Sequence, residues 1–378
     1  MIWIRRILVC ILTLLVAAIS VTVMVVLVAG VALSGGDANS YQKAEPVDAA
    51  IMDRYDMFIT HHTSNALDGV LDIKKVYWLS DDELVPPAPD QEKFGMTDDP
   101  ATLAWLLEEA ADILDGQETL FSTDLQIAPN TQVRYYLDET ILAITWKQGV
   151  GGSMYTISEV KIGHPSQFRR FLTGNEYGSP IRKTTSSMAA SVNAVVASSG
   201  DFYAFRQMGV IVYDGIVRRT DPQRVDTCYI DEDGNMLFSY RGELADMESA
   251  QKFVDENNIR FSLAFGPALI ADGELCSYNG YTLGEAFENY ARAGLGQLND
   301  LHYILVAANN ERPYGRSVTI AEFQQAMAGF GCRYAYTLDG GQTAVIVHNG
   351  QVINNVVYGE QRNVSDIIYF ATAMPEWD

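Results

Sequence analysis

Apolar and polar residues alternate along the middle of the chain with the two-residue period of half-buried strands. Three such runs follow one another at 133–137, 141–146 and 154–160, and glycines mark the second turn. They predict a β-meander, and we expect a short helix after it, at 166–172. No internal repeat or low-complexity tract interrupts the pattern.

Before the meander, apolar residues are spaced three and four positions apart, as on one face of a helix. This spacing predicts helices at 49–71 and from Pro100 to about Gly116, with a proline-rich linker at 85–90. We therefore expect a stalk and helical region at 37–130 that is separate from the functional part of the chain.

After the meander, strands alternate with occasional helices. Few strands are linked by helical crossovers, which disfavours a doubly wound fold. The expected fold class is α+β: a mixed, mostly antiparallel β-sheet domain with packed helices, preceded by the helical region and an N-terminal transmembrane helix. The expected elements are strands at 191–197 and 301–307, helices at 243–257 and 319–330, and hairpins that turn at Asp214-Gly215 and Asp233-Gly234.

The run from 7 to 33 contains no charged residue and is longer than the roughly 20 residues that a helix needs to cross a bilayer. Arg5 and Arg6 precede it, so the positive-inside rule places the N-terminus in the cytoplasm and the remainder outside. A cleaved signal peptide is the alternative, although the apolar cores of signal peptides have only about 7–15 residues. We expect a single-pass anchor in the cell membrane and an extracellular C-terminal domain.

These changes of pattern divide the chain into four parts. They are a cytoplasmic stub with the anchor at 1–36, the stalk and helical region at 37–130, the meander with its short helix at 131–183, and the C-terminal domain at 184–378. The candidate chemistry lies in the last part.

The chain is strongly acidic, with 48 Asp and Glu residues against 26 Lys and Arg and a formal net charge of −22. Such a surface repels nucleic-acid phosphates and anionic lipids, so no nucleic-acid partner is expected. Outside the predicted anchor the cysteines are Cys228, Cys276 and Cys332. They form either one disulfide with one free thiol or three buried thiols, and the lack of a Cys-x-x-Cys spacing disfavours a structural zinc site.

The segment around Asp339 poses the main chemical question, because a predicted strand ends there and two glycines follow. Asp-Gly is a strong hairpin signal, and the chain has others at Asp214, Asp233 and Asp272. From spacing alone, Asp339 is either an ordinary turn residue or a carboxylate at the end of a buried strand, where the glycines leave room for a ligand.

A second polar segment follows the apolar run that ends near Gly200. It presents Asp201, Tyr203 and Arg206, either at a ligand cleft or as a surface loop with an Asp–Arg pair. The histidines are scattered, and the sequence has no His-Glu-x-x-His motif, Gly-rich phosphate loop or nucleophile elbow. Spacing alone assigns a function to neither segment.

An ordered set of motifs lies between about 184 and 373. The set comprises Ser199-Gly-Asp-Phe-Tyr203 with Arg206, Phe265-Gly-Pro-Ala-Leu-Ile270 with Asp272-Gly273, Arg292-Ala-Gly-Leu-Gly-Gln297, Thr319-Ile-Ala-Glu322, Leu338-Asp-Gly-Gly-Gln-Thr343 and Gln361-Arg-Asn-Val364. Together they resemble the phosphodiester glycosidases, the family related to the enzyme that uncovers mannose 6-phosphate by removing N-acetylglucosamine from its phosphodiester. The N-terminal half, with Lys75-Val-Tyr-Trp-Leu-Ser-Asp81, is similar to the membrane-anchored bacterial branch. Two motifs depart from the family pattern: Ser199 replaces Asn in the first, and Gln342-Thr343 replaces Gly-Ser in the other.

The resemblance implies cleavage of a sugar-1-phosphodiester in a cell-envelope or exopolysaccharide glycan. Asp201 and Asp339 are the implied catalytic carboxylates, acting as nucleophile or base on an oxocarbenium-like transition state. The chemistry requires no cofactor or metal, and a cation that did bind would be Ca²⁺ or Mg²⁺ on oxygen ligands. The alternative is a non-catalytic envelope-glycan binding protein that keeps the glycosidase fold. The implied substrate-binding residues are Ser199, Arg206, Arg292, Gly340, Gly341, Gln342 and Thr343, with the arginines on the phosphate.

Several residues near the motifs are expected to be structural. Glu322 is expected to cap a helix together with Thr319. Arg362 is expected to form an ion pair at a strand edge, and His348 is expected to be a packed side chain rather than a catalyst.

Overall fold

The computed structural model describes one compact part of the chain. The described residues are 85–120, 131–282, 287–309 and 316–373. The predicted anchor at 7–33, the stalk and the helix at 49–71 lie outside them. None of the described helices is both long and apolar enough to span a bilayer.

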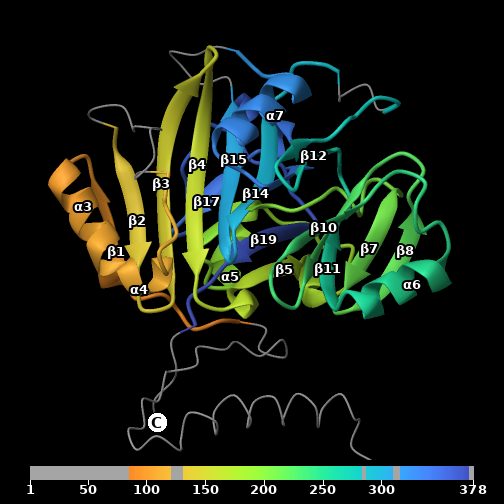
Figure 1. Cartoon of the computed structure of the whole chain (residues 1–378), viewed down its shortest axis with the longest axis horizontal. Helices are drawn as coiled ribbons and strands as arrows, with labels where there is room; N and C mark the ends of the chain where they lie inside the picture. The colour runs from red at the N-terminus through yellow and green to blue at the C-terminus, as the bar shows by residue number, and fades with distance from the viewer. Residues whose placement is uncertain (1–84, 121–130, 283–286, 310–315, 374–378) are drawn as a thin grey trace, which may run out of the picture. The chain divides into compact units, whose positions relative to one another are not determined.

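A nine-stranded sheet forms the largest layer of the fold (Figure 1). Its strands, in spatial order, are β1 (Phe94–Thr97), β2 (Val133–Leu137), β3 (Ile141–Val150), β4 (Ser153–Ile162), β15 (His302–Asn309), β14 (Arg292–Asn299), β16 (Tyr334–Leu338), β12 (Ala268–Ala271) and β13 (Glu274–Leu275). The predicted meander is confirmed as β2, β3 and β4. Because β4 pairs with β15 along its length, the segments 131–183 and 184–378 build one sheet together.

Two five-stranded sheets complete the β-structure of the described part. One has the order β18 (Gln351–Val352), β17 (Ile346–His348), β6 (Val196–Ser199), β19 (Asp366–Phe370) and β5 (Phe168–Leu172). The other has the order β10 (Met236–Ser239), β9 (Thr227–Asp231), β11 (Ile259–Leu263), β7 (Gly209–Tyr213) and β8 (Ile216–Asp221). The predicted hairpins at Asp214 and Asp233 are confirmed as β7–β8 and β9–β10. The described part thus confirms a mostly antiparallel β-sheet domain.

Two elements expected from the sequence are wrong. The segment 166–172 is not a helix: a 3-10 turn occupies Pro165–Gln167, and β5 follows because its residues pair with β19. The segment 191–197 is not one strand, because the helix α5 occupies Thr185–Ser191 and β6 begins only afterwards. Both short runs are compatible with either structure, so pairing with distant strands and a threonine cap decided the outcome.

The helices of the described part cover outer faces of the sheets (Figure 1). Two predicted helix starts are confirmed: Asp99 caps α3 ahead of Pro100, and Thr319 and Glu322 form the expected capping box of α7. α3, α4 and α7 pack on the large sheet, α5 lies against β6 and β19, and α6 lies against β8 and β11. The bounds are α3 Pro100–Glu109, α4 Ala111–Leu114, α6 Met247–Glu256 and α7 Ile320–Gly329.

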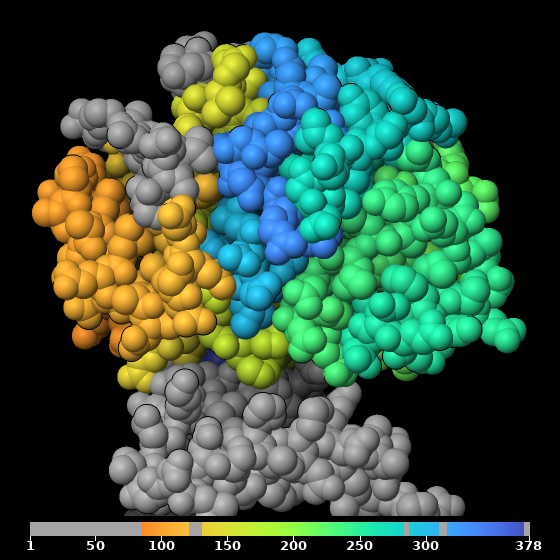
Figure 2. All heavy atoms as spheres, viewed as in Figure 1, coloured from red at the N-terminus to blue at the C-terminus, as the bar shows by residue number. Residues whose placement is uncertain are grey.

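Two apolar cores hold the large sheet in place. One lies where the three sheets meet, and the other lies between the large sheet and α3, α4 and α7, where Leu106 and Leu114 are buried with Phe323. Figure 2 shows the blue C-terminal segments packed between yellow and green ones, so segments distant in sequence share one surface. Residues 100–116, which the sequence pattern set apart, therefore help to build the core.

Replacing Leu106 with alanine should lower the free energy of unfolding by about 2–5 kcal/mol, because it deletes a buried side chain and leaves a cavity. Urea titration followed by circular dichroism measures the change. Trp105→Ala is the matched control, since Trp105 lies on the same helix and is 50% exposed. An equal loss in both variants would show that α3 is not anchored through its buried face.

The remaining structural expectations concern His348 and the cysteines. His348 is packed as predicted: its Nδ1 lies 2.8 Å from Thr145 Oγ1, and burial lowers its pKa to about 4. Cys228, Cys276 and Cys332 are free, so the alternative with a disulfide among them is excluded in this structure. Burial raises the pKa of each thiol, which disfavours the nucleophilic thiolate form.

Candidate active site

Asp339 lies where the chain passes from one sheet to another. It directly follows β16, which pairs with β14 and β12 in the nine-stranded sheet. The next strand, β17, pairs instead with β6 and β18. The hairpin interpretation of this segment is therefore wrong, and Asp339 also lacks the positive φ of Asp214 and Asp272.

The carboxylate of Asp339 is buried but paired. The residue is 6% exposed, and its Oδ2 forms an ion pair with Nη2 of Arg362. Burial raises the pKa of Asp339 to about 6, against the opposing effects of Arg362, Thr343 and Arg206. A carboxyl group that titrates near neutral pH is suited to proton transfer or nucleophilic attack.

The two glycines after Asp339 shape its loop. A Cβ on Gly340 would lie 2.5 Å from the carbonyl oxygen of Ala291, and Gly341 has a φ of +66°, so both positions need glycine. The amide of Gly341 donates a hydrogen bond of 2.8 Å to the same carbonyl. This amide is therefore engaged by the protein in this conformation, and the predicted role of Gly341 in substrate binding stays untested.

Three further predicted residues surround the same loop. Ser199 Oγ donates to the backbone carbonyl of Asp339 at 3.3 Å and is fully buried, so it holds the loop. Thr343 Oγ1 donates to the carbonyl of Gly340 at 2.6 Å. Gln342 is half-buried, and its Nε2 lies 3.5 Å from the carbonyl of Glu360.

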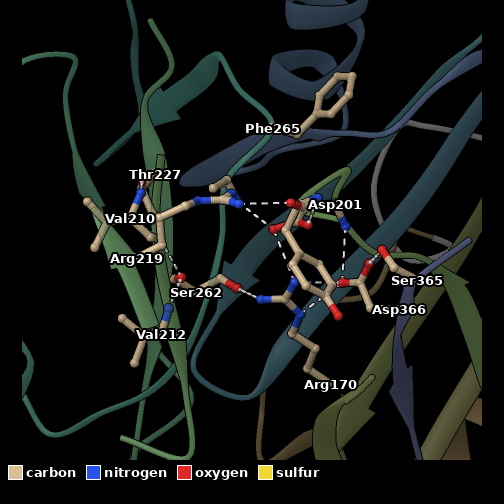
Figure 3. Close-up of polar contacts among 12 residues, drawn as sticks. Arg170, Asp201, Val210, Val212, Arg219, Thr227, Ser262, Phe265, Ser365 and Asp366 are labelled. Carbon is tan, nitrogen blue, oxygen red and sulfur yellow. Dashed lines mark hydrogen bonds and ion pairs between the residues drawn. The ribbon is translucent and has the colours of Figure 1, made fainter. Parts of the chain in front are cut away.

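The main chains at Asp201 and Asp339 lie side by side in space, since the amide of Asp339 donates a hydrogen bond of 3.3 Å to the carbonyl of Gly200. Its carboxylate, however, belongs to a buried cluster with Arg170 and Asp366 (Figure 3). Nη2 of Arg170 lies 3.1 Å from Oδ2 of Asp201 and 2.8 Å from Oδ2 of Asp366. The amides of Tyr203 and Ala264 also donate to Asp201, at 2.7 and 2.8 Å.

This arrangement gives Asp201 a positioning role, because its carboxylate accepts amide hydrogen bonds and pairs with Arg170. The role predicted for it as nucleophile or base stays a prediction. Burial raises the pKa of Asp366 to about 7, and the charge of Asp201 adds to the effect while Arg170 opposes it. Neither Arg170 nor Asp366 was predicted as part of the site, since no local motif links β5 to β19.

The predicted role of Arg206 and Arg292 in phosphate binding stays a prediction. Arg206 acts on Asp339 through its charge, which lowers the pKa of that residue. The backbone of Arg292 lies against Gly340, and its guanidinium contacts backbone carbonyls: Nε donates to that of Val318 at 3.3 Å, and Nη2 donates to that of Glu288 at 2.5 Å. The second guanidinium beside Asp339 is that of Arg362, which the sequence interpretation had treated as a strand-edge ion pair although it lies within the last motif.

Arg206 and Arg362 are held on aromatic rings. The Cζ of Arg206 lies 5.5 Å from the ring centroid of Phe202 and 5.1 Å from that of Phe265. The Cζ of Arg362 lies 4.9 Å from the Phe202 centroid. Aromatic faces stabilise guanidinium groups and fix their orientation, which prepares them for an anion.

The described residues contain no group of three His, Cys, Asp or Glu side chains that could hold a metal ion. Among the described residues, Arg362 pairs with Asp339, and the charge of Arg206 also lowers the pKa of Asp339. A phosphate group complements the positive charge and the planar shape of these two groups, since a guanidinium donates two parallel hydrogen bonds to two phosphate oxygens.

The fold and the site together define the class of protein. It is an α+β domain of mostly antiparallel strands whose candidate site combines a carboxylate with guanidinium groups. Within it, residues 192–371 match the model of the phosphodiester glycosidase family, which confirms the predicted family for this segment. The family supports a glycosidase-type hydrolase function on phosphodiester-linked sugars. Apart from Arg170, the residues that contact Asp201 and Asp339 lie in the matched segment.

The chain is similar to several known proteins. It is 25% identical over 203 residues to the SPbeta prophage-derived uncharacterized protein YomE of Bacillus subtilis (strain 168), an overlap that covers 52% of this chain and 31% of the relative. The chain thus spans about a third of that relative's length.

Solved structures with related folds include a hypothetical protein from Synechocystis, with a TM-score of 0.49 and 14% identity over 61% of this chain and 62% of that one. Another is the catalytic domain of zebrafish N-acetylglucosamine-1-phosphodiester alpha-N-acetylglucosaminidase auto-inhibited by its pro-peptide. For that domain the TM-score is 0.48 and the identity 17%, over 61% of this chain and 82% of that one.

Proposed function

We propose that this protein hydrolyses the bond between the anomeric carbon and the phosphate oxygen of sugar-1-phosphodiesters in cell-envelope or exopolysaccharide glycans. The observation that supports it most is the buried carboxylate of Asp339, which has a raised pKa and is paired with Arg362 next to Arg206. The proposed reaction needs a proton acceptor or nucleophile beside phosphate-binding groups, and Asp339 and the two arginines are our candidates for these roles.

The guanidiniums of Arg206 and Arg362 bind the phosphodiester. This contact moves Arg362 away from Asp339. Cleavage breaks the bond between the anomeric carbon and oxygen, and the electron pair leaves on the phosphate. The phosphate group thereby changes from a monoanion to a more highly charged monoester, so the guanidiniums bind the transition state more tightly than the substrate. Because phosphate is an acidic leaving group, little general-acid assistance is needed.

Asp339 acts on the sugar side of the bond. As a base it accepts a proton from the water that attacks the anomeric carbon; as a nucleophile it first forms a glycosyl ester that water then hydrolyses. In both routes the products are the free sugar and a phosphate monoester. Asp201, Arg170 and Asp366 hold the loop next to Asp339 in place.

A non-catalytic glycan-binding protein is the alternative function. The engagement of Asp201 by Arg170 favours it, because only one of the two predicted catalytic carboxylates, that of Asp339, is then paired with Arg362. The two functions are separated by incubating the purified protein with N-acetylglucosamine 1-(methyl phosphate). Release of free N-acetylglucosamine supports hydrolysis, whereas binding without release supports the alternative.

The proposed location is the outer surface of the cell membrane, since the uncharged run at 7–33 follows Arg5 and Arg6. Protease added to intact cells should then degrade an epitope tag at the C-terminus, and a cytoplasmic marker protein should survive. A protected C-terminal tag would place the domain inside the cell and exclude surface glycans as substrates.

A further inference from the structure

A hollow of about 640 Å³ lies beside the loop of Asp339, and the segment 352–361 lines it. This segment meets the candidate active site at two points. Nε2 of Gln342 lies 3.5 Å from the carbonyl of Glu360 within the segment. Arg362, which pairs with Asp339, directly follows the segment. A ligand bound at Asp339 can therefore extend into the hollow.

The lining segment is held near both of its ends. Asn354 is buried, its Oδ1 accepts from the amide of Ile346 at 2.8 Å, and its Nδ2 donates to the carbonyl of Ala344 at 2.7 Å. The side-chain amide of Gln361 forms two hydrogen bonds with Ser186, of 3.1 and 2.8 Å. These contacts preform the hollow, which reduces the entropy lost when a ligand binds.

Tyr358 lies in the middle of this segment and is 88% exposed. Its backbone has a φ of +63° and a ψ of 8°. This left-handed conformation is unfavourable for a bulky residue, and a side chain so exposed gains little stability from packing. Residues held in unfavourable backbone conformations concentrate at ligand sites, which makes Tyr358 a candidate for binding rather than for folding.

The side chains that line the hollow suit a neutral sugar. Tyr358, Val356 and Val357 supply apolar surface, and Asn355 and Glu360 add polar groups. None of the residues that line the hollow is cationic, so this lining offers an anionic group no counter-charge. A sugar ring has both kinds of surface: the C–H groups of its faces pack on aromatic rings, and its hydroxyl groups bond to amides and carboxylates.

We propose that this hollow, with the ring of Tyr358 as its stacking surface, is a subsite for a neutral sugar of a glycan whose phosphodiester lies at Asp339. The inference rests on the proposed function and deepens it, because the substrate then has a second sugar beside the one that is released. The second sugar is either the alcohol part of the phosphodiester or the neighbour of the cleaved sugar in the glycan. Tyr358 is thus a specificity residue.

Three probes test the subsite. The smallest is N-acetylglucosamine 1-(methyl phosphate); the second has the 6-hydroxyl of methyl glucoside in place of methanol, and the third has N,N′-diacetylchitobiose in place of N-acetylglucosamine. The kcat/KM of the wild-type protein should be about tenfold higher for one of the larger probes, which identifies the position of the second sugar. Tyr358→Asn should remove most of this preference, and Tyr358→Phe should keep it because the ring remains.

Two controls separate the loss of the ring from other effects. Asparagine adopts a left-handed backbone more readily than tyrosine, so Tyr358→Asn should unfold at the same or a higher urea concentration than the wild type. Tyr240→Asn removes another exposed tyrosine, which follows β10 on a different sheet, and should leave the preference unchanged. Hydrolysis without a preference for either larger probe, or an equal loss in Tyr358→Asn and Tyr240→Asn, would overturn the subsite.

A binding measurement decides the matter if no probe is hydrolysed. Calorimetric titration with methyl glucoside and with N,N′-diacetylchitobiose should show that one of them binds about tenfold more weakly to Tyr358→Asn than to Tyr240→Asn. In that case the proposed hydrolysis fails and the sugar subsite stands. Equal binding to both variants, or binding to neither, would overturn the subsite as well.

Discussion

Asp339→Asn is expected to lower kcat/KM for N-acetylglucosamine 1-(methyl phosphate) by about 10²–10⁴-fold, the range of a lost acid or base. Asparagine has nearly the shape of aspartate but neither accepts a proton nor forms a glycosyl ester. Its amide keeps the loop between the sheets filled, so the fold should be retained. Release of N-acetylglucosamine measures the loss, and circular dichroism checks the fold.

The pH profile gives a second readout of the same variant. Asp339 must be ionised to act, and burial raises its pKa to about 6. Wild-type kcat/KM should therefore rise as pH increases through about 6, and the residual activity of Asp339→Asn should lack this rise. Asp214→Asn is the matched control, because Asp214 is the Asp-Gly aspartate of the β7–β8 hairpin. An Asp339→Asn variant with near wild-type turnover would remove Asp339 from the mechanism.

Arg170→Met is expected to lower the free energy of unfolding by about 3–5 kcal/mol, because it leaves Asp201 and Asp366 buried side by side without a counter-charge. Chemical denaturation at pH 7.5 measures the loss. Adding Asp366→Asn to Arg170→Met should recover part of it, since one buried charge is then removed. No recovery in the double variant would show that Arg170 acts through packing alone.

The same pair predicts a pH dependence of stability. The pKa of Asp366 is raised to about 7 in the folded protein, above its ordinary value in the unfolded chain. The folded state therefore binds this proton more tightly, and its contribution to stability grows as pH falls from about 7 toward 4. In Arg170→Met the pKa of Asp366 should rise further, because the opposing charge of Arg170 is gone. The deficit should therefore shrink as pH falls toward 7, where the variant takes up this proton before the wild-type protein does. A deficit that does not change with pH above 7 would contradict the charge cluster.

Sequence patterns correctly predicted those strands, turns and helix caps that depend on neighbouring residues alone. The alternation at 133–160 gives the meander, the two Asp-Gly turns give hairpins, and Thr319 with Glu322 gives a capping box. Short apolar runs were ambiguous. The run at 166–172 became a strand because β19 pairs with it, and such a partner cannot be found from spacing.

In the candidate site, too, contacts between residues distant in sequence could not be predicted from local patterns. The Asp-Gly pair at Asp339 has the local signal of a hairpin, yet β16 and β17 belong to different sheets, and only the tertiary pairing shows this. Arg170 comes from β5 and meets Asp201 across sequence positions that share no motif. Arg292 carried the family motif, but its guanidinium donates to backbone carbonyls, which depends on chain folding around Val318 and Glu288.

The most direct test of the proposed hydrolysis is to let the protein act on N-acetylglucosamine 1-(methyl phosphate) in ¹⁸O-labelled water and analyse both products by mass spectrometry. Attack at the anomeric carbon, guided by Asp339, should place the label on N-acetylglucosamine and leave methyl phosphate unlabelled. Because the free sugar slowly exchanges its anomeric oxygen, the unlabelled methyl phosphate is the decisive product. Label on methyl phosphate would show attack at phosphorus and contradict a glycosidase mechanism, and the absence of either product would contradict hydrolysis altogether.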